Sequence, residues 1–342
     1  MIITYFRSSS FNTYGMCPQQ YFLSYVLGVP SPGGKKAEKG TIVHKVLECL
    51  AQGKKAEQES EESFDDDALG EQPTNRIHEE LFVNELSRLS FDYYTQKSIH
   101  DFSEKDYRDC EKWAWKAIKY SDGDYDPRKR DIVDAEPHFD ITIDEPWAEY
   151  DYTMPDGSRL HGNLSIKGTV DLITDAGNGV YEATDWKTGM RKDWATGEIK
   201  DFWKLCGDPQ LRIYHYALTH LYPEAKQIVP SIYFINDGGP FTMAYDDSDI
   251  DATKDMLRKR FEEIKNVVRP QLLTGYNRWK CNSFCHYGKT EHPSGKINPR
   301  TGEPYTICQY VADKTKKCGM DTVIAEDTYK DHTIDYYQDP GA

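Results

Sequence analysis

Three side chains near the middle of the sequence have types and a spacing that suit cleavage of a phosphodiester bond. They lie in or directly after two apolar runs of β-strand composition, residues 166–173 and 180–186. The segment between the runs is rich in Gly and Asn, which tolerate the positive φ of a tight turn, so we expect a β-hairpin. A turn centred on Asn178 pairs residues whose numbers sum to 356. The three side chains are Asp171 and Asp185, which this register places opposite each other, and Lys187.

This arrangement brings two carboxylates and one ammonium group to the same place. Side chains alternate along a strand, so Lys187 lies on the same face as Asp185. Like charges at cross-strand distance repel each other and raise the pKa of one group unless a cation lies between them. A divalent metal ion on the carboxylates, with the lysine orienting water or offsetting phosphate charge, explains the pairing. The alternative is a surface hairpin with solvated charges, and an Asp-x-Lys sequence alone does not decide between the two.

The composition indicates a protein with a core of its own and no membrane span. The chain has 342 residues, which favours about two domains. No run approaches the ~20 apolar residues of a membrane-spanning helix, and the N-terminus lacks the pattern of a secretory signal. We therefore predict a cytoplasmic protein, in the bacterial host cytoplasm if a phage encodes it. The eight Cys are reduced there, so any cluster of them favours a metal site over disulfides.

The net charge of −15 counts against a general affinity for nucleic acid. Much of the acid, however, lies in segments that look peripheral, residues 57–67 and the chain from residue 326 onward. Any contact with DNA must therefore be local.

The first part of the chain has a helical pattern interrupted by one charged segment. Residues 8–26 form two short helical segments separated by Pro18, with Cys17 at the joint. Residues 39–52 have apolar side chains at helical spacing, and His44 lies beside that stripe. Such a histidine is either a core residue or a metal ligand. Residues 53–72 are charged and predict a flexible acidic loop.

The rest of the chain alternates between helices and strands. We expect helices over residues 75–89 and 103–120, strands from residue 131 up to the hairpin, and then a helix that begins at Asp208-Pro209. Gln210 and Tyr214 share one face of that helix, either as a polar edge with a half-buried ring or as partners in hydrogen bonds with phosphate or with the lysine. Strands over residues 228–235 and 241–245 and a helix over residues 249–268 complete the pattern.

Four of the eight Cys lie in the last part of the chain, which makes a metal or cluster site plausible there. Cys281 and Cys285 have a C-x3-C spacing, which is a weaker signal than paired C-x2-C motifs. Cys308 and Cys318 follow a loop of Gly and Pro. Isolated Cys elsewhere in the chain have the character of ordinary packing residues.

Four segments together resemble the RecB-type nucleases of the PD-(D/E)XK superfamily in order and spacing. They are GTIVH (40–44), GTVD (168–171), DWKTG (185–189) and QLRIY (210–214). The resemblance implies an α/β (α+β) fold with a mixed central β-sheet flanked by helices and a restriction-endonuclease-like core. It also implies His44, Asp171 and Asp185 as ligands of Mg²⁺ or Mn²⁺ and Lys187 as the catalytic lysine, while Gln210 and Tyr214 match the Q-x-x-x-Y motif.

A subset of that family, which includes AddB and CRISPR-associated nucleases, carries a [4Fe-4S] cluster on one early and three late Cys. That arrangement is matched here by Cys17, Cys281, Cys285 and Cys308. The resemblance therefore implies that the C-terminal region is an iron-sulfur region joined to Cys17 through the cluster. The late Cys of that subset are closer together, so Cys318 competes with Cys308 as the fourth ligand, and Zn²⁺ is the alternative to the cluster.

The sequence thus predicts a helical region over residues 1–130, a nuclease core over residues 131–268 and a Cys-rich region over residues 269–342. The predicted function is a metal-dependent DNA nuclease, an exonuclease in preference to an endonuclease, that acts on DNA ends or single strands in recombination, repair or phage DNA processing. The alternatives are a catalytically silent protein that binds DNA ends or a partner, and a zinc-stapled interaction module. The chain has no G-x-x-x-x-G-K-[ST] motif, which excludes a helicase-nuclease fusion.

Overall fold

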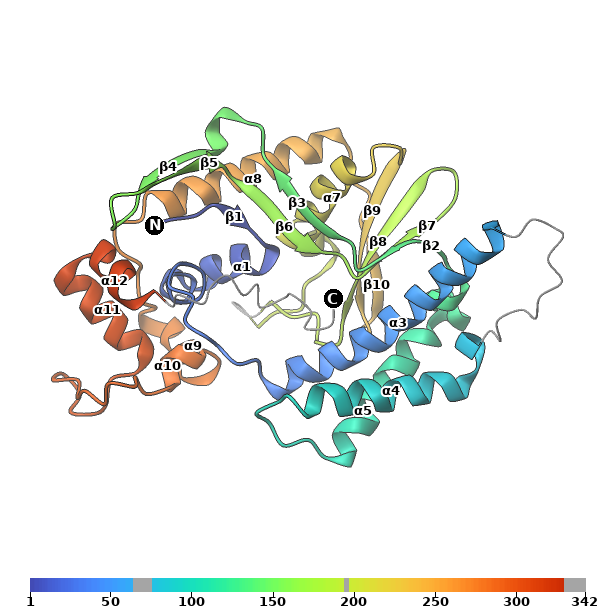
Figure 1. Ribbon diagram of the computed structural model, residues 1–342, viewed down its shortest axis with the longest axis horizontal. Helices are drawn as coiled ribbons and strands as arrows, with labels where there is room; N and C mark the ends of the chain where they lie inside the picture. The colour runs from blue at the N-terminus through green and yellow to red at the C-terminus, as the bar shows by residue number, and fades with distance from the viewer. Residues whose placement is uncertain (64–75, 194–196, 329–342) are drawn as a thin grey trace. The chain divides into compact units, whose positions relative to one another are not determined.

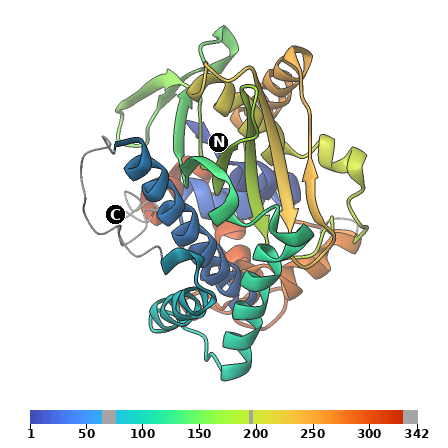
Figure 2. The ribbon, with the colours of Figure 1, turned by 90° about the vertical axis from the view of Figure 1, so that its right-hand side faces the viewer.

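The computed structural model describes residues 1–63, 76–193 and 197–328. Contacts divide the chain into two compact units, each made of segments that are distant in the sequence (Figures 1 and 2). The first unit contains Met1–Pro32, Ile141–Lys167 and the chain from Lys254 onward, and the second contains Gly33–Asp140 and Gly168–Thr253. The division into three consecutive regions stays a prediction.

A mixed five-stranded sheet lies at the centre of the second unit, in agreement with the predicted fold class. Its strand order is β10-β9-β8-β7-β2. β8 runs parallel to β9, and the other neighbours are antiparallel. The strands are β2 (Asp131–Ala135), β7 (Leu172–Asp175), β8 (Val180–Lys187), β9 (Gln227–Phe234) and β10 (Gly239–Thr242).

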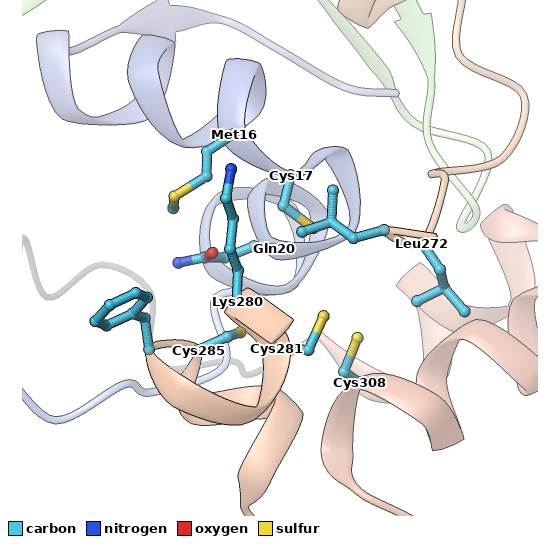
Figure 3. A pocket seen from close by; sticks show the side chains of 10 residues that line it. Met16, Cys17, Gln20, Leu272, Lys280, Cys281, Cys285 and Cys308 are labelled. Carbon is cyan, nitrogen blue, oxygen red and sulfur yellow. The ribbon is translucent and has the colours of Figure 1, made fainter. Parts of the chain in front are cut away.

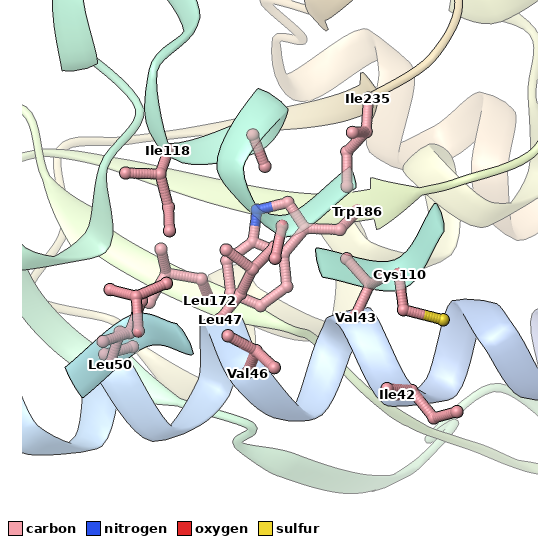
Figure 4. Packing of buried hydrophobic residues seen from close by; sticks show 14 of the residues in the cluster. Ile42, Val43, Val46, Leu47, Leu50, Cys110, Ile118, Leu172, Trp186 and Ile235 are labelled. Carbon is pink, nitrogen blue, oxygen red and sulfur yellow. The ribbon is translucent and has the colours of Figure 1, made fainter. Parts of the chain in front are cut away.

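Two apolar clusters flank this sheet because side chains alternate along its strands. Trp186 of β8 and Tyr233 of β9 pack into a cluster with the long helix α3 and with α4 and α5 (Figure 4). Ile232 and Phe234 of β9 point the other way and pack against α6 and the segment after β10. The helices of this unit are α3 (Lys35–Ser63), α4 (Glu80–Thr95), α5 (Glu104–Ile118), α6 (Phe202–Cys206) and α7 (Pro209–Leu221), with short helical turns η2 (Arg76–His78), η3 (Tyr120–Gly123) and η4 (Pro127–Lys129).

Helix α3 is longer than the sequence predicted, which corrects the acidic loop over residues 53–72. The helix continues to Ser63, and residues 64–75 lie outside the described residues. Its polar side chains have partners on β2: Lys55 Nζ lies 3.0 Å from an oxygen of Asp134, and Gln58 Nε2 donates to Asp131 Oδ1 at 2.7 Å. Charged residues with high helix propensity therefore extend the helix along the sheet edge without an apolar stripe.

The hairpin has the register that the sequence predicted. Leu172 pairs with Thr184 and Asp175 with Tyr181, and both pairs sum to 356. The turn residue Asn178 has a φ of 58°, which lies in the left-handed region.

The first strand of the hairpin is not continuous, which corrects the single run over residues 166–173. It is split into β6 (Ser165–Thr169), which belongs to a different sheet, and β7. At the break, Val170 N–H donates to Pro137 O at 3.2 Å, and Glu136 N–H donates to Asp171 O at 3.1 Å. These long-range backbone bonds hold Asp171 just outside the ladder.

The first unit contains small sheets and short helices. A three-stranded sheet has the order β1-β6-β3, and β4 pairs with β5 in a two-stranded one. Cys17 lies between α1 and α2, as predicted, because Pro18 begins the second helix. No helix within the described residues is long and apolar enough to cross a bilayer. The remaining elements are β1 (Tyr5–Phe6), α1 (Ser8–Met16), α2 (Pro18–Tyr21), η1 (Phe22–Val26), β3 (His138–Thr142), η5 (Pro146–Ala148), β4 (Glu149–Thr153), β5 (Arg159–Asn163), α8 (Asp247–Lys265), η6 (Gly275–Arg278), α9 (Trp279–Ser283), α10 (His286–Lys289), α11 (Ile307–Cys318) and α12 (Met320–Asp327); β3, β6 and α8 run from one unit into the other.

Candidate active site

Strand β8 carries a buried ion pair near its C-terminal end. Asp185 and Lys187 are two residues apart and therefore share a face, opposite to the buried Trp186. Lys187 Nζ lies 2.6 Å from Asp185 Oδ2, and the side chains are 35% and 3% exposed. Lys187 is thus the more accessible member of the pair.

The two oxygens of Asp185 have different environments. Oδ1 accepts a hydrogen bond from Gln210 Nε2 at 2.7 Å and lies 3.3 Å from the hydroxyl of Tyr214. Oδ2 is buried and accepts no hydrogen bond of good geometry, so the ion pair with Lys187 is its partner. Burial raises the pKa of Asp185, and the charge of Asp171 adds to this effect, while Lys187 opposes it.

Asp171 is held at the end of the strand break and faces helix α3. Its Oδ2 accepts a hydrogen bond from Trp186 N–H at 2.6 Å and lies 3.6 Å from His44 Nδ1. Burial opposes ionisation of this carboxyl, but the charges of His44 and Lys187 and the Trp186 N–H outweigh it, so the pKa of Asp171 is lowered. The two carboxyl groups therefore have pKa values shifted in opposite directions.

Helix α3 places His44 beside Asp171 through a close contact with the end of β8. A Cβ on Gly40 would lie 2.9 Å from Thr188 Oγ1, so only Gly permits this approach. The imidazole of His44 packs edge-on against Trp186, with ring centroids 6.1 Å apart. Burial lowers the pKa of His44, but the nearby Asp171 carboxylate more than compensates, so the pKa is raised.

Helix α7 supplies the two remaining predicted residues. Its start is fixed as the sequence predicted, because Asp208 accepts a hydrogen bond from Gln210 N–H at 3.0 Å and Pro209 follows. Gln210 Nε2 also lies 2.9 Å from the hydroxyl of Tyr214, one turn later, and that hydroxyl donates to Thr169 O at 2.8 Å. Burial raises the pKa of Tyr214 well above its usual value, so the hydroxyl stays a donor.

The six residues that the sequence selected for the nuclease site all lie in the second unit. His44 contacts Asp171, and Asp185 contacts Lys187 and Gln210; the two groups meet at β8, where Trp186 N–H binds Asp171. Sequence reasoning did not single out Lys200, whose ammonium lies 2.6 Å from Asp208 Oδ2 at the start of α7. Nothing in the local sequence marks this lysine, because its partner lies eight residues away, on the far side of the short helix α6.

The side chains have the chemistry of a divalent-metal site, although their present arrangement does not form one. Across residues 1–63, 76–193 and 197–328, no group of three or more His, Cys, Asp or Glu side chains is arranged to hold a metal ion. Two carboxylates and an imidazole are donors that Mg²⁺ and Mn²⁺ accept. The buried Asp185 Oδ2 accepts no hydrogen bond of good geometry and has the ammonium of Lys187 as its ion-pair partner. The donor set therefore fits a divalent metal.

The first unit has a separate group of four cysteines around one cavity (Figure 3). Cys17 comes from the joint of α1 and α2, Cys281 from α9, Cys285 precedes α10, and Cys308 lies in α11. Burial raises the pKa of Cys17, Cys285 and Cys308, and the neighbouring thiols contribute to this effect. As they stand, these thiols do not form a group arranged to hold a metal ion, but sulfur is the donor type that iron-sulfur clusters and zinc ions take. The cavity lining also includes the apolar Met16 and Leu272 and the polar Gln20 and Lys280.

Cys318 lies elsewhere in the same unit. It is the last residue of α11, is exposed, and does not line the cavity. Cys308 is buried at the other end of that helix and lines the cavity with the three other thiols. Of the two competing residues, Cys308 therefore lines the same cavity as Cys17, and Cys318 does not.

Comparison with known proteins gives one family. The sequence model of the PD-(D/E)XK nuclease superfamily matches residues 8–289. No curated protein matches significantly. Among solved structures, a protein of Eubacterium rectale that is provisionally named an exonuclease aligns with 79% of this chain and 90% of its own, at 11% identity and a TM-score of 0.40.

Proposed function

Since the chain belongs to the PD-(D/E)XK nuclease superfamily, we propose that it is a Mg²⁺- or Mn²⁺-dependent DNA nuclease of the RecB type. The observation that carries the proposal is the buried Asp185, which bonds Gln210 on one oxygen and faces Lys187 on the other. An isolated buried carboxylate costs several kcal/mol unless charge or hydrogen bonds compensate. A site with a buried carboxylate beside a second carboxylate is best explained by a cation that both carboxylates bind.

Each side chain then has a distinct role. Asp171, Asp185 and His44 would hold the ion, which when bound lowers the pKa of water and offsets charge on a phosphate oxygen. Lys187 stays protonated: burial lowers its pKa, but Asp185 and Asp171 raise it further. Its partly exposed ammonium can orient water or bind the phosphate. Gln210 and Tyr214 hold Asp185 in place, and Trp186 N–H holds Asp171.

The test is cleavage of end-labelled linear DNA and of closed circular DNA, with Mg²⁺, with Mn²⁺ and with chelator. We expect cleavage of linear DNA that depends on the metal, and little cleavage of closed circles, as for an exonuclease. Asp185→Ala should lose both metal binding and cleavage, while Lys187→Ala should keep metal and lose at least ~10²-fold in rate.

The matched control is Lys226→Ala, an exposed lysine near the turn end of β8. It should leave the cleavage rate unchanged. Full activity of Lys187→Ala would refute the assignment, and efficient cutting of closed circles would identify an endonuclease instead.

We also propose that Cys17, Cys281, Cys285 and Cys308 bind a [4Fe-4S] cluster. The four thiols line one cavity although they come from chain segments up to 291 residues apart. A group bound there ties both ends of the chain together and reduces the freedom of the unfolded chain, as a cross-link does.

The protein purified without oxygen should be brown and contain about four iron and four sulfide per chain. Cys17→Ala and Cys308→Ala should bleach it and lower its melting temperature, whereas Cys318→Ala should keep the colour. A colourless preparation with stoichiometric zinc would instead identify a zinc site, and this result would leave the nuclease proposal intact.

A further inference from the structure

The segment of residues 264–290, in the first unit, has a charge opposite to that of the whole protein. It contains five Lys and Arg and no Asp or Glu, in a chain with 57 acidic and 42 basic residues. At the average frequency of the chain, a segment of this length would contain four or five acidic residues. The segment is therefore a local site of attraction for a polyanion. Its basic residues are Lys265, Arg269, Arg278, Lys280 and Lys289.

Three of these cations are available to a ligand. Arg269, Arg278 and Lys289 are exposed. None of the three has an acidic side chain within ion-pair distance in the part of the chain that the structure describes. Exposed cations on other elements are commonly paired, as Arg88 is with Glu104 and Arg159 with Asp151. Among the described residues, these three positive charges thus have no carboxylate as an ion-pair partner.

Large aromatic rings lie exposed among these cations. Tyr276 is 89% exposed, Phe284 57% and Trp279 40%. The rings of Trp279 and Phe284 contact each other at 5.2 Å between centroids, with an angle of 68°. Exposed rings cost free energy in water, so three within nine residues indicate a surface that another molecule covers.

The exposed rings belong to a well-anchored segment. Tyr287, three residues after Phe284, is buried, and its hydroxyl donates to Val29 O at 2.5 Å. A Cβ on Gly288 would lie 2.3 Å from the carbonyl oxygen of Cys281, so the backbone there is closely packed. The backbone on either side of Phe284 is therefore held in place by close packing.

Other exposed apolar groups of the protein lack this charge pattern. Trp203 on α6 is 79% exposed, but it lies beside Asp201 and close to Glu198. Leu89 on α4 is 67% exposed, and Glu85 and Asp92 lie on the same helix. Tyr93 on α4 lies beside the exposed Lys97, but Asp92 adjoins it in the sequence. Residues 264–290 differ from these places because three exposed rings lie there in a segment without any Asp or Glu.

We propose that residues 264–290 bind single-stranded nucleic acid, with bases stacked on Tyr276 and Trp279 and phosphates on Arg269, Arg278 and Lys289. Stacking needs an unpaired base with an open face, and it combines with phosphate contacts in proteins that bind single strands. A duplex offers the phosphates but keeps its bases covered. The proposal deepens the proposed function, on which it rests for the choice of DNA, because it names the form of the substrate.

The experiment measures binding of the full-length protein to fluorescent oligothymidine and to a duplex of equal length, in chelator so that no cleavage occurs. A length of about 16 nucleotides covers the site sizes known for single-strand binders. Tyr276→Ala should weaken single-strand binding by about 5- to 150-fold, which corresponds to 1–3 kcal/mol per stacked base. Duplex binding should not change. Because Tyr276 is 89% exposed, its loss should not affect folding.

Two further variants complete the test. Arg278→Ala should weaken both complexes and reduce the salt slope of single-strand binding by about 0.7, the value for one lost phosphate contact. Tyr93→Ala, an exposed tyrosine of α4 (40%), is the control and should change neither complex. Equal losses for single strand and duplex with Tyr276→Ala, or competition by polyglutamate as strong as by oligothymidine, would overturn stacking. Unchanged binding in both variants would overturn the surface itself.

Failure of this binding proposal can be distinguished from failure of the proposed nuclease function. If Lys187→Ala cleaves DNA normally while Tyr276→Ala loses single-strand binding, the nuclease assignment fails and the binding surface stands. If Lys187→Ala is inactive while Tyr276→Ala binds as the unaltered protein does, the opposite holds.

Discussion

At the scale of single residues, the site is a set of side chains that hold one carboxylate. Gln210 and Tyr214 both approach Asp185 Oδ1, and Tyr214 is tied in turn to the backbone of Thr169. This geometry makes them positioning residues for Asp185. A direct contact between these two side chains and a phosphate is not required to explain their place in the site.

Tyr214→Phe should therefore reduce metal affinity as well as cleavage. The ring is buried and keeps its edge contact with Phe139, so the fold should remain while the hydroxyl contacts are lost. Loss of groups that orient a metal ligand typically weakens metal binding 10- to 100-fold. Calorimetric titration with Mn²⁺ measures this. Tyr222→Phe, at the end of the same helix, is the control. Unchanged Mn²⁺ affinity in Tyr214→Phe would contradict the positioning role and favour a role of Gln210 and Tyr214 in substrate binding.

At the scale of elements, the site depends on the contact between α3 and β8. Only this contact brings His44 to Asp171, because α3 and the hairpin are more than a hundred residues apart in the sequence. Gly40 sits at the closest point, 2.9 Å from Thr188 Oγ1 if it carried a Cβ.

Gly40→Ala tests the contact through two opposing effects. Alanine raises helix propensity by up to about 1 kcal/mol, whereas its Cβ forces α3 or Thr188 to move. In a Thr188→Ala background the Oγ1 atom is gone. Gly40→Ala should therefore raise the free energy of unfolding, measured with urea, by about 0.5–1 kcal/mol more in that background than in the unaltered protein. The single variant should also lose cleavage as His44 is displaced. If the effects of the two substitutions on the free energy of unfolding were strictly additive, the contact between residue 40 and Thr188 would not restrict the side chain at position 40.

At the scale of the whole molecule, the abundant tyrosines determine how stability responds to alkaline pH. Burial raises the pKa of Tyr107, Tyr152 and Tyr287 to about 12 in each case, from an ordinary value of 10.0. Between these values the unfolded chain loses phenol protons that the folded protein keeps. Stability is therefore fully present below about pH 10 and falls as the pH rises toward 12.

Urea unfolding at pH 8 and at about pH 11 should show a lower midpoint at the higher pH, where unfolded tyrosines ionise. Absorbance of tyrosinate in the folded protein should stay below that of the unfolded chain. Tyr107→Phe removes one ionisable group and keeps the ring, so its midpoint should fall by less than that of the unaltered protein. An identical fall in both would show that Tyr107 does not contribute.

The sequence by itself determined the local features of the site. The turn residues and the alternation of apolar side chains set the hairpin register that sums to 356, and Asp208-Pro209 set the start of α7. Asp185 shares a face with Lys187, and Gln210 with Tyr214, for the same reason. These features follow from strand and helix periods, which a short stretch of sequence contains in full.

Only the tertiary structure decided what depends on distant parts of the chain. The strand break at Asp171 arises from backbone bonds to Glu136 and Pro137, and α3 extends to Ser63 because its polar side chains meet β2. Cys308 lines the cavity with Cys17, whereas Cys318 does not, because the first turn of α11 and not its last residue reaches the cavity. Such contacts are formed by packing between segments far apart in the sequence, and no local pattern specifies them.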